Sequence, residues 1–406
     1  MPTPPDSFTA TGHPALATAL ATPPTTPPTT EPTTEPTTEP TTEPTTEPTT
    51  EPAIASGASP AADDGVRRWL VATAWSVVAA VVVGGVTRLT ESGLSITVWE
   101  PVAGILPPLS HADWERAYHG YLQIPEAQTV HRGITLGGFQ ALYWWEWVHR
   151  LVARGVGLVI ALPYLWLLVR GRIPVGKRLV LGTLPVLVAA QGVLGWYMVS
   201  SGLSVRTDVS QYRLVAHLLL ALVILVVAVW EATTLARARR DAAVRAADHA
   251  PQRFATAPTA LAALAFLTIA SGGFVAGLDG GKVYNEFPLM GGQWMPREYA
   301  HLSPLWHNWF DNPVAAQFNH RVLAMLTLVS ALALFAVGRR VMAGAPARAI
   351  QRVAIVVVIQ VALGITTLLW SVPVVVAALH QLGAVALLAA AIVAANETRA
   401  AVGRVA

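Results

Sequence analysis

The sequence predicts an all-α integral membrane protein with eight transmembrane helices, arranged as two four-helix bundles related by a pseudo-twofold axis. Of its 406 residues, 53% are hydrophobic and only 13% are charged, whereas soluble proteins carry about twice that charged fraction. Several apolar runs approach or exceed the roughly 18 residues needed to cross a bilayer. Short motifs from the first half of the chain return in the second half, which indicates an internal repeat.

The N-terminal tail, residues 1–62, has a different composition from the rest of the chain. It is rich in Thr, Pro, Glu and Ala, and residues 29–52 are six consecutive copies of TTEP. A proline at every fourth residue, with Phe8 as the one aromatic side chain, leaves too little to form a core, so we expect disorder. The start of the chain lacks the basic and apolar regions of a secretory signal peptide, and none is predicted.

Eight apolar segments follow the tail, and each has the length of a membrane-spanning helix. A short turn at 371–373 separates the last two, which predicts a tight helical hairpin. The segments lie near 68–87, 147–169, 178–200, 213–235, 257–277, 318–338, 352–370 and 374–395.

Two motifs relate the halves to each other. HRLVA at 149–153 matches HRVLA at 320–324, and QGVLG at 191–195 matches QVALG at 360–364. Each half holds four segments, an even number, so the two repeats cross the membrane in the same direction. The predicted units are a disordered tail at 1–62, an N-terminal half at 63–240 and a C-terminal half at 241–406.

Basic residues predict the orientation in the membrane. Arginine and lysine gather before the first segment, after the second, fourth and sixth segments, and at the C-terminus. The positive-inside rule makes this side cytoplasmic, with both termini inside and the loops 88–146 and 278–317 outside. Because the basic residues are scattered over short loops, the lipid bilayer is the expected partner and nucleic acid is not. The chain has no cysteine, which excludes disulfides, thiolate metal sites and cysteine nucleophiles.

Four histidines head the even-numbered segments, all near the outer side: His149, His217, His320 and His380. A polar side chain at membrane depth indicates a function, because an unpaired one in hydrocarbon is costly. Two imidazoles on neighbouring helices can be the axial ligands of a haem iron. The expected pairs are His149 with His217, and His320 with His380. Interfacial histidines bonded to a neighbouring helix, and copper or zinc as the metal, remain alternatives.

Arginines on the outer side oppose the positive-inside bias. They suit the two propionates of a haem, although long cationic side chains also extend to the interface for no other reason. The propionate interpretation is better for Arg150 and Arg321, which each follow a histidine directly. The full set is Arg88, Arg150, Arg154, Arg213 and Arg321.

One acidic residue distinguishes the two halves. Glu146 precedes His149 by three residues and so shares its helical face, whereas Gln317 stands at that position before His320. A carboxylate in a low-dielectric site can act as a base or stabilise a developing cation. Its alternative role is structural, as a partner of Arg150. The difference predicts a reactive site in the first half and a resting cofactor site in the second.

At these residues the chain resembles haem A synthase, of the branch without a cysteine pair. The resemblance extends from about residue 68 to 395. The stretches that carry it are GGVTRLTESGLSI (84–96), PPLS…W (107–114), YWWEWVHR (143–150), GLDGGKVYNEFP (277–288) and NPVAAQFNHR (312–321).

The resemblance implies an enzyme that oxidises the C8 methyl group of haem O to a formyl group by successive hydroxylations, giving haem A for cytochrome oxidase. It implies a haem b cofactor, a location in the cell inner membrane and haem sites near the outer side. Candidate partners are haem O as substrate, haem O synthase, cytochrome oxidase assembly factors and a second copy of the chain. The implied roles are haem b binding by His320, His380 and Arg321, substrate haem binding by His149, His217, Arg150 and Arg88, and catalysis by Glu146.

For mechanism, we expect haem b to relay electrons from the substrate methyl carbon while Glu146 assists attack by water. Two alternatives come from other classes of protein. A di-haem b-type electron-transfer cytochrome would hold permanent haems at both histidine pairs. A transporter built on parallel repeats would use Glu146 and the histidines as a proton relay.

Overall fold

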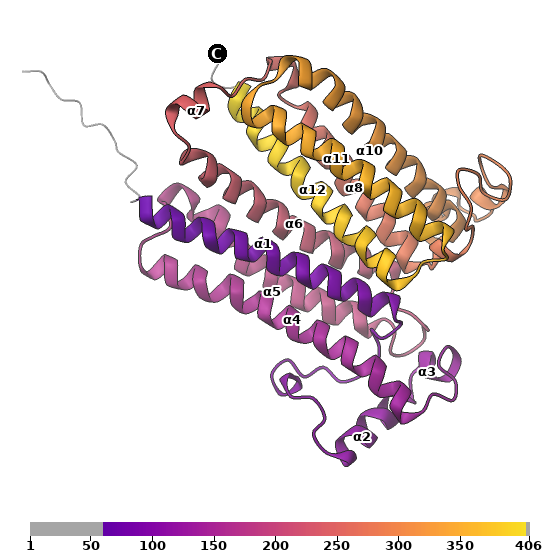
Figure 1. Cartoon of the computed structure of the whole chain (residues 1–406). Coiled ribbons are helices and arrows are strands. Elements are labelled where there is room, and N and C mark those ends of the chain that lie inside the picture. Colours follow the sequence, from indigo (N-terminus) through magenta and orange to yellow (C-terminus); the bar gives the residue numbers. More distant parts are fainter. Residues whose placement is uncertain (1–59, 403–406) are drawn as a thin grey trace, which may run out of the picture. The chain divides into compact units, whose positions relative to one another are not determined.

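The computed structural model describes residues 60–402, in which eight helices are long and apolar enough to cross a membrane (Figure 1). Among these described residues there is no β-strand. This confirms the predicted all-α membrane protein. Of the predicted tail, residues 1–59 lie outside the described residues, and residues 60–62 belong to the start of α1. The long helices are α1 (Pro60–Leu89), α4 (Leu136–Val169), α5 (Arg178–Ser200), α6 (Gln211–Ala238), α8 (Ala257–Gly277), α10 (Pro313–Val341), α11 (Gly344–Leu369) and α12 (Val374–Val402).

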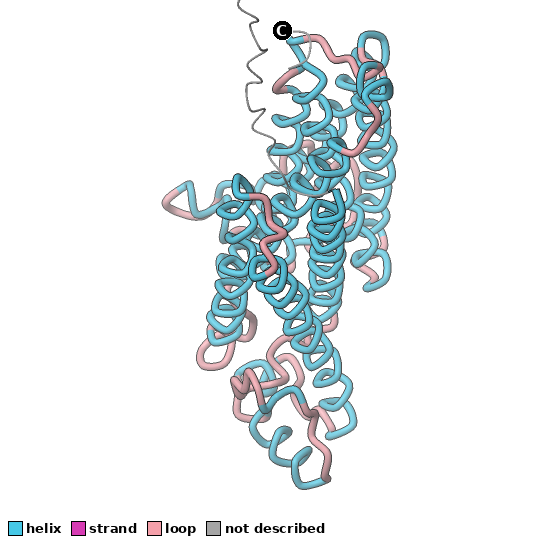
Figure 2. Tube along the Cα trace, turned by 90° about the vertical axis from the view of Figure 1, so that its left-hand side faces the viewer, coloured by secondary structure: helices cyan, strands magenta, loops and turns pink. Residues whose placement is uncertain are grey.

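The same helix pairings occur in both halves of the chain. In the first half α1 packs on α4 and α6, and α5 packs on α4 and α6. In the second half α8 packs on α10 and α12, and α11 packs on α10 and α12. Helices α6 and α12 contact each other, and each also contacts the other half's first helix, α8 or α1 (Figure 1). Figure 2, in which helices are cyan, shows the long helices running roughly side by side. All described residues belong to one compact unit, so the division at residue 240 and the twofold axis remain predictions.

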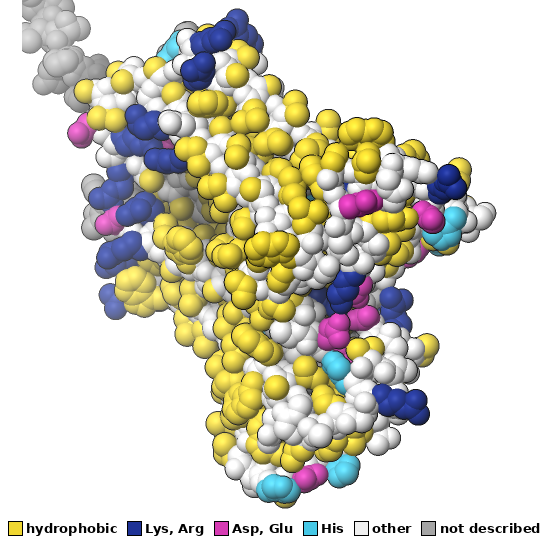
Figure 3. All heavy atoms as spheres, turned by 45° about the vertical axis from the view of Figure 1, so that its right-hand side comes forward, with side chains coloured by type: hydrophobic (Ala, Val, Ile, Leu, Met, Phe, Trp, Pro, Cys, Tyr) yellow, Lys and Arg dark blue, Asp and Glu magenta, His cyan; other side chains and the backbone are white. Residues whose placement is uncertain are grey.

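Apolar side chains cover the flank of the helices, and charged side chains gather at the two ends (Figure 3). The four histidines lie toward one of these ends, which we call the histidine end. His217, His320 and His380 lie in the first three turns of α6, α10 and α12, and His149 lies further inside α4. Two connecting segments lie there: the first segment, residues 90–135, between α1 and α4, and the second segment, residues 278–312, between α8 and α10. These two segments and the histidines below them form the region of interest.

Helix α4 begins well before the start predicted at residue 147. The Thr135 side chain caps it by accepting a hydrogen bond from the Gly138 N–H at 3.2 Å. Phe139 and Tyr143 are buried in a cluster with Tyr121 of the first segment. This contact supports three extra turns that lipid could not stabilise, and it places Glu146 in mid-helix instead of at a helix start.

The first segment has helices of its own, α2 (His111–Tyr121) and α3 (Pro125–Thr129), which were not predicted. Ser110 caps α2 in a capping box: its hydroxyl accepts from the Asp113 N–H, and the Asp113 carboxylate accepts from the Ser110 N–H. The Ser-x-x-Asp pattern is the sequence signal that could have found this helix. The second segment has only one four-residue α-helix, α9 (Asn308–Asp311), and three short 3-10 turns.

Candidate functional site

Each of the four histidines lies against a glycine of a neighbouring helix. A Cβ atom added at any of these glycines would stand only 2.7 to 3.0 Å from the imidazole Cε1 atom, which is closer than carbon atoms pack. The glycines are therefore required for the rings to occupy these positions. The facing pairs are Gly84 with His149, Gly195 with His217, Gly272 with His320, and Gly364 with His380.

These glycines extend the internal repeat. Gly195 and Gly364 end the QGVLG and QVALG motifs, so the recurring motif places a glycine against a histidine in each half. Gly84 and Gly272 each begin a Gly-Gly pair in α1 and α8. Sequence reasoning missed these two positions, although the repeated Gly-Gly pair was a visible signal.

The second histidine pair has a spacing that suits one shared iron. The ring centres of His320 and His380 are 6.4 Å apart, with the ring planes at 87°. Two imidazoles that bind one metal ion from opposite sides, with nitrogen–metal distances of about 2 Å, leave roughly 6 Å between ring centres. Across residues 60–402, no group of three or more His, Asp or Glu side chains is placed to hold a bare metal ion. The 6.4 Å spacing of the pair itself fits the two axial positions of a haem iron.

The second ring nitrogens of the histidines differ between the pairs. Nδ1 of His320 hydrogen-bonds with the Ser271 hydroxyl at 2.9 Å, and Nδ1 of His380 with the Gln360 amide at 3.1 Å. Nδ1 of His149 and Nδ1 of His217 are buried and have no hydrogen-bond partner within the described part of the chain. One pair of imidazoles is thus tethered and the other is not.

Glu146 is buried, and hydrogen-bond donors surround its carboxylate. Oε1 accepts from Arg150 Nε at 3.0 Å and from Arg150 Nη2 at 2.7 Å. Oε2 accepts from the Ser95 hydroxyl at 2.8 Å and the Ile96 N–H at 2.6 Å. The Glu146 side chain is only 3% exposed, and these hydrogen bonds hold the first segment against α4.

Arg150 also fastens the first segment to α4. Its Nη2 donates to the Ile96 carbonyl at 2.7 Å, and its Nη1 to the Val98 carbonyl at 3.0 Å. One turn further along α4, Arg154 donates to the carbonyls of Glu100 and Pro101. One face of α4 therefore holds the main chain from 95 to 101, and binding of a propionate by Arg150 remains a prediction.

The second half repeats this arrangement with an amide in place of the acid. Gln317 Nε2 and Arg321 Nη2 both donate to the Tyr284 carbonyl at 3.1 Å, and Arg321 Nη2 also donates to Gln317 Oε1 at 3.2 Å. Arg321 Nη1 donates to the Leu289 carbonyl at 3.0 Å. Tyr284 follows Gly272 by the same number of residues as Ile96 follows Gly84. Both halves thus share one arrangement, which we call the frame: the arginine that follows the histidine donates hydrogen bonds to main-chain carbonyls of the connecting segment in its own half.

Arg88 lies apart from the other predicted arginines. Its Nη2 donates to Asp279 at 2.9 Å and to the Ala276 carbonyl at 3.1 Å, and its Nη1 is 3.5 Å from Asp208. These contacts join the end of α1 to the start of the second segment. Whether Arg88 also meets a propionate remains a prediction.

A second buried acid, Glu126, lies in the first segment and was not predicted. Its side chain is 3% exposed, and burial, with the charge of Asp208 next, raises its pKa to about 8. Its Oε2 is 3.4 Å from the Tyr121 hydroxyl, which in turn is 2.6 Å from Nδ1 of His131. Burial also raises the pKa of Tyr121 above its ordinary value. Glu126 is therefore protonated over much of the pH range between 4.5 and about 8.

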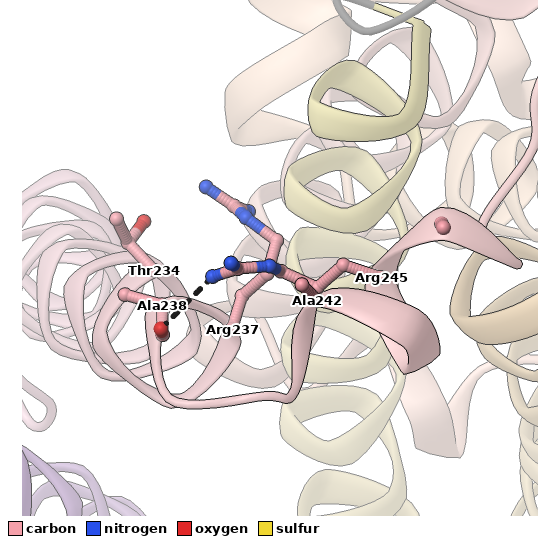
Figure 4. Close-up of a pocket in the computed structure, with 6 residues that line it drawn as sticks. Thr234, Arg237, Ala238, Ala242 and Arg245 are labelled. Carbon is pink, nitrogen blue, oxygen red and sulfur yellow. Dashed lines mark hydrogen bonds between the residues drawn. The ribbon is translucent and has the colours of Figure 1, made fainter.

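A cavity of about 480 Å³ lies at the far end of α6 from His217 (Figure 4). Thr234, Arg237, Ala238, Ala242, Arg245 and Ala246 line it. The Arg245 guanidinium donates to the Ala238 carbonyl at 3.0 Å across its edge. The length of α6 separates this cavity from the histidine end, so it is not part of the site.

Comparison with known proteins adds family membership to this geometry. The family model described as "Cytochrome oxidase assembly protein" matches residues 67–392. The chain is 42% identical over 328 residues to a protein named "Heme A synthase" from Sinorhizobium fredii, covering 80% of this chain and 88% of the relative. It is 44% identical over 320 residues to another of that name from Rhodopseudomonas palustris, with coverages of 78% and 84%. A third, from Nitrosospira multiformis, is 41% identical over 333 residues, with coverages of 82% and 92%. The chain belongs to the cytochrome oxidase assembly protein family and is a relative of these haem A synthases.

Proposed function

We propose that this protein is a haem A synthase, a membrane oxidoreductase that converts the C8 methyl group of haem O to the formyl group of haem A. The net change takes the oxygen atom from water: CH3 plus H2O gives CHO, four protons and four electrons, and an external electron acceptor must take up these electrons. An enzyme for this reaction must hold one haem as substrate, remove electrons from it and let the product leave. Two haem sites, one exchangeable and one permanent, meet these requirements.

The observation that carries this proposal is that the two halves share the histidine–glycine contacts but differ in one acidic residue. Both halves set a histidine pair against glycines, so both suit a haem. Only the first half places a carboxylate, Glu146, one turn from its histidine. We therefore assign the substrate haem to His149 and His217, and the cofactor haem b to His320 and His380. Haem b bound there would supply one-electron transfer.

Glu146 is the residue that we propose to act on the reacting carbon. An ionised carboxylate in a dry site stabilises positive charge that develops nearby, and it can take a proton from an attacking water. Its four hydrogen bonds fix its position. We infer that it acts first by stabilising charge, and as a base when a donor such as Ser95 turns away.

We further propose a location in the inner membrane, with the histidine end on its outer side. The cationic ends of α5, α6 and α10 lie opposite the histidine end, and a cytoplasmic position suits them. Protons from the reaction would then leave toward the outside. Haem O synthase and cytochrome oxidase assembly factors are the partners expected for such an enzyme.

The test is haem extraction and chromatography from cells that supply haem O, with and without this protein. We expect haem A only when the chain is present. The Glu146→Gln variant should accumulate haem O and partly oxidised haem while keeping haem b. Haem O left unchanged by the wild-type protein would overturn the proposed function, and a normal haem A yield from the variant would remove Glu146 from the chemistry.

The alternative, a di-haem b-type electron-transfer cytochrome, has one observation in its favour, because the histidine–glycine frame is equally complete in both halves. The same extraction distinguishes it, since such a cytochrome would bind two haems b and leave haem O unchanged. The relatives named as haem A synthases make this alternative the weaker one.

A further inference from the structure

The hydrogen bonds at His320 have a definite direction. The Ser271 hydroxyl donates its proton to the Thr268 carbonyl at 2.7 Å. Its oxygen therefore accepts from Nδ1–H of His320 at 2.9 Å, and the Thr268 carbonyl accepts from the same N–H at 3.1 Å. With the proton on Nδ1, the lone pair of Nε2 is free for a metal ion.

Gln360 makes the corresponding contact with His380. Its amide is 3.1 Å from Nδ1, and its Oε1 is buried without a partner in the described part of the chain. A half-turn of the amide places this oxygen against Nδ1, where it accepts the ring proton. His380 can then also present Nε2 to a shared iron.

The first pair lacks both partners for reasons visible in the sequence. Ser271 immediately precedes Gly272, but Val83 precedes the matching Gly84 and offers no hydrogen-bonding group. Gln191 occupies the motif position of Gln360, yet its Nε2 donates to the His217 main-chain carbonyl at 2.9 Å. Within residues 60–402, Nδ1 of both histidines of this pair is consequently buried without a partner.

A hydrogen bond on the far nitrogen changes how an imidazole binds metal. It fixes the tautomer and the ring orientation, and it makes the ligating nitrogen a stronger donor. Loss of such a partner typically lowers metal affinity by about 10- to 100-fold. Tethered imidazoles suit a haem that stays, and untethered imidazoles suit one that must leave after each reaction.

We propose that Ser271 and Gln360 are positioning residues that make His320 and His380 retain their haem, and that the lack of such partners at His149 and His217 makes the first site exchangeable. This inference rests on the proposed function, in which the first site takes substrate and the second keeps a cofactor. It assigns the difference between the sites to hydrogen bonds outside the iron ligands.

The experiment measures haem release without turnover. Full-length protein is purified in detergent with its haem b, and haem transfer to excess apomyoglobin is followed for Ser271→Ala and Gln360→Leu. Ser76→Ala is the matched control for the first, because the Ser76 hydroxyl also donates to the carbonyl three residues earlier, and its described hydrogen bond involves no histidine. Gln191→Leu is the control for the second, since it removes the matching glutamine of the other half.

Gln360→Leu should release haem b about 10- to 100-fold faster than wild type. Ser271→Ala should have a smaller effect, since the Thr268 carbonyl stays as an acceptor, and Ser271→Thr should restore the wild-type rate. In Gln360→Leu and Ser271→Ala the midpoint potential of haem b should rise, because an imidazole that donates less strongly stabilises ferric iron less. The low-spin g-values of haem b should shift as well. Wild-type release rates and potentials in both would overturn the proposal.

Val83→Ser tests the proposal in the opposite direction and does not depend on the other variants folding. A hydroxyl there should slow the release of haem O from the first site several-fold, and an unchanged rate would contradict the inference. These outcomes are separate from the proposed function. A chain that binds haem b but makes no haem A would disprove the synthase activity and would still report the effect of Ser271 and Gln360 on retention.

Discussion

The first and second halves of the chain share the same hydrogen-bonded frame but differ in the side chain that pairs with its arginine. In each half an arginine after the histidine donates to the main chain of the segment above, at Ile96 in one half and Tyr284 in the other. The partner of that arginine is the carboxylate of Glu146 in the first half and the amide of Gln317 in the second. Because the amide serves the frame equally well, holding the segment does not require an acid. The charge in the first half therefore points to another role.

The same contrast extends into the connecting segments. The first segment buries the acid Glu126, whereas the buried polar side chains of the second segment and the start of α10 include the amides Asn308, Asn312 and Gln317. Amides satisfy buried hydrogen bonds without the cost of burying a charge. A site that only holds a cofactor has no need of titratable groups, but a site that transfers protons does.

Substitution of the histidine-facing glycines should have the largest effect, a loss of bound haem from the half that carries the substitution. In Gly364→Ala the new Cβ would stand 2.8 Å from the His380 ring, so the imidazole must move and haem b should be almost completely lost. Gly195→Ala should instead prevent substrate haem binding and leave haem b in place. Haem b per chain, measured as the pyridine haemochrome, checks both.

Gly192→Ala is the matched control in the same helix as Gly195. No heavy atom of the described residues stands within 4 Å of a Cβ added there. The variant should bind both haems and gain up to about 1 kcal/mol in unfolding free energy. If Gly192→Ala lost haem as readily as Gly195→Ala, close contact with the histidine would not be the reason.

Replacing the acid should have the next largest effect. Glu146→Gln should lower haem A formation by about 10²- to 10⁴-fold, the usual contribution of a positioned acid or base. The fold should survive, because Gln317 shows that an amide supports the same frame. Ser95→Ala removes one donor to Glu146 but keeps the charge, and it should cost only about 1.5 to 3 kcal/mol of local stability. Equal losses of activity in the two variants would point to anchoring alone.

The pH dependence of stability should follow Glu126. Its folded-state pKa of about 8 lies above the ordinary value of 4.5, so the folded protein binds the extra proton between these values. Stability should therefore fall as the pH rises from about 5 to 8, by a few kcal/mol. In Glu126→Gln the slope over this range should be markedly smaller. Thermal unfolding of the purified protein at several pH values measures it, and an unchanged slope in the variant would contradict the assignment.

The smallest expected effect concerns the helix that only the first segment possesses. Ser110→Ala removes the cap of α2 and should cost about 1 kcal/mol. Hydrogen exchange should quicken in the amides of 111–121 and stay unchanged in the second segment. A spread of faster exchange into the second segment would mean that the two segments are coupled more tightly than their separate anchors suggest.

Much of the fold could be predicted from the sequence because lipid imposes a simple rule. Continuous apolar runs must be helices in a bilayer. Six predicted boundaries coincide with the structure, at Val169, Arg178, Ser200, Ala257, Gly277 and Val374. The start of α4 was missed because its first turns pack on Tyr121, a contact between residues distant in sequence. Apolar periodicity carries no information about such a contact.

The four histidines of the site could be predicted from the sequence, but the glycines that face them and the partners of their Nδ1 atoms could not. His149, His217, His320 and His380 stood out because polar residues are rare in spans. Gly84 and Gly272 did not, because a glycine in a membrane helix has many uses and only the structure brings each one against a ring. The Nδ1 partners depend on single side-chain orientations: Gln191 and Gln360 occupy the same motif position and yet bond differently.

The central claim is that the first histidine pair binds an exchangeable substrate haem and the second pair retains a haem b cofactor. The most direct test is the haem content of purified His149→Ala and His380→Ala proteins from cells that supply haem O. We expect His149→Ala to keep one haem b per chain and to make no haem A, and His380→Ala to lose haem b. If His149→Ala instead lost half of the haem b found in the wild-type protein, both sites would hold permanent haems and the account would be contradicted.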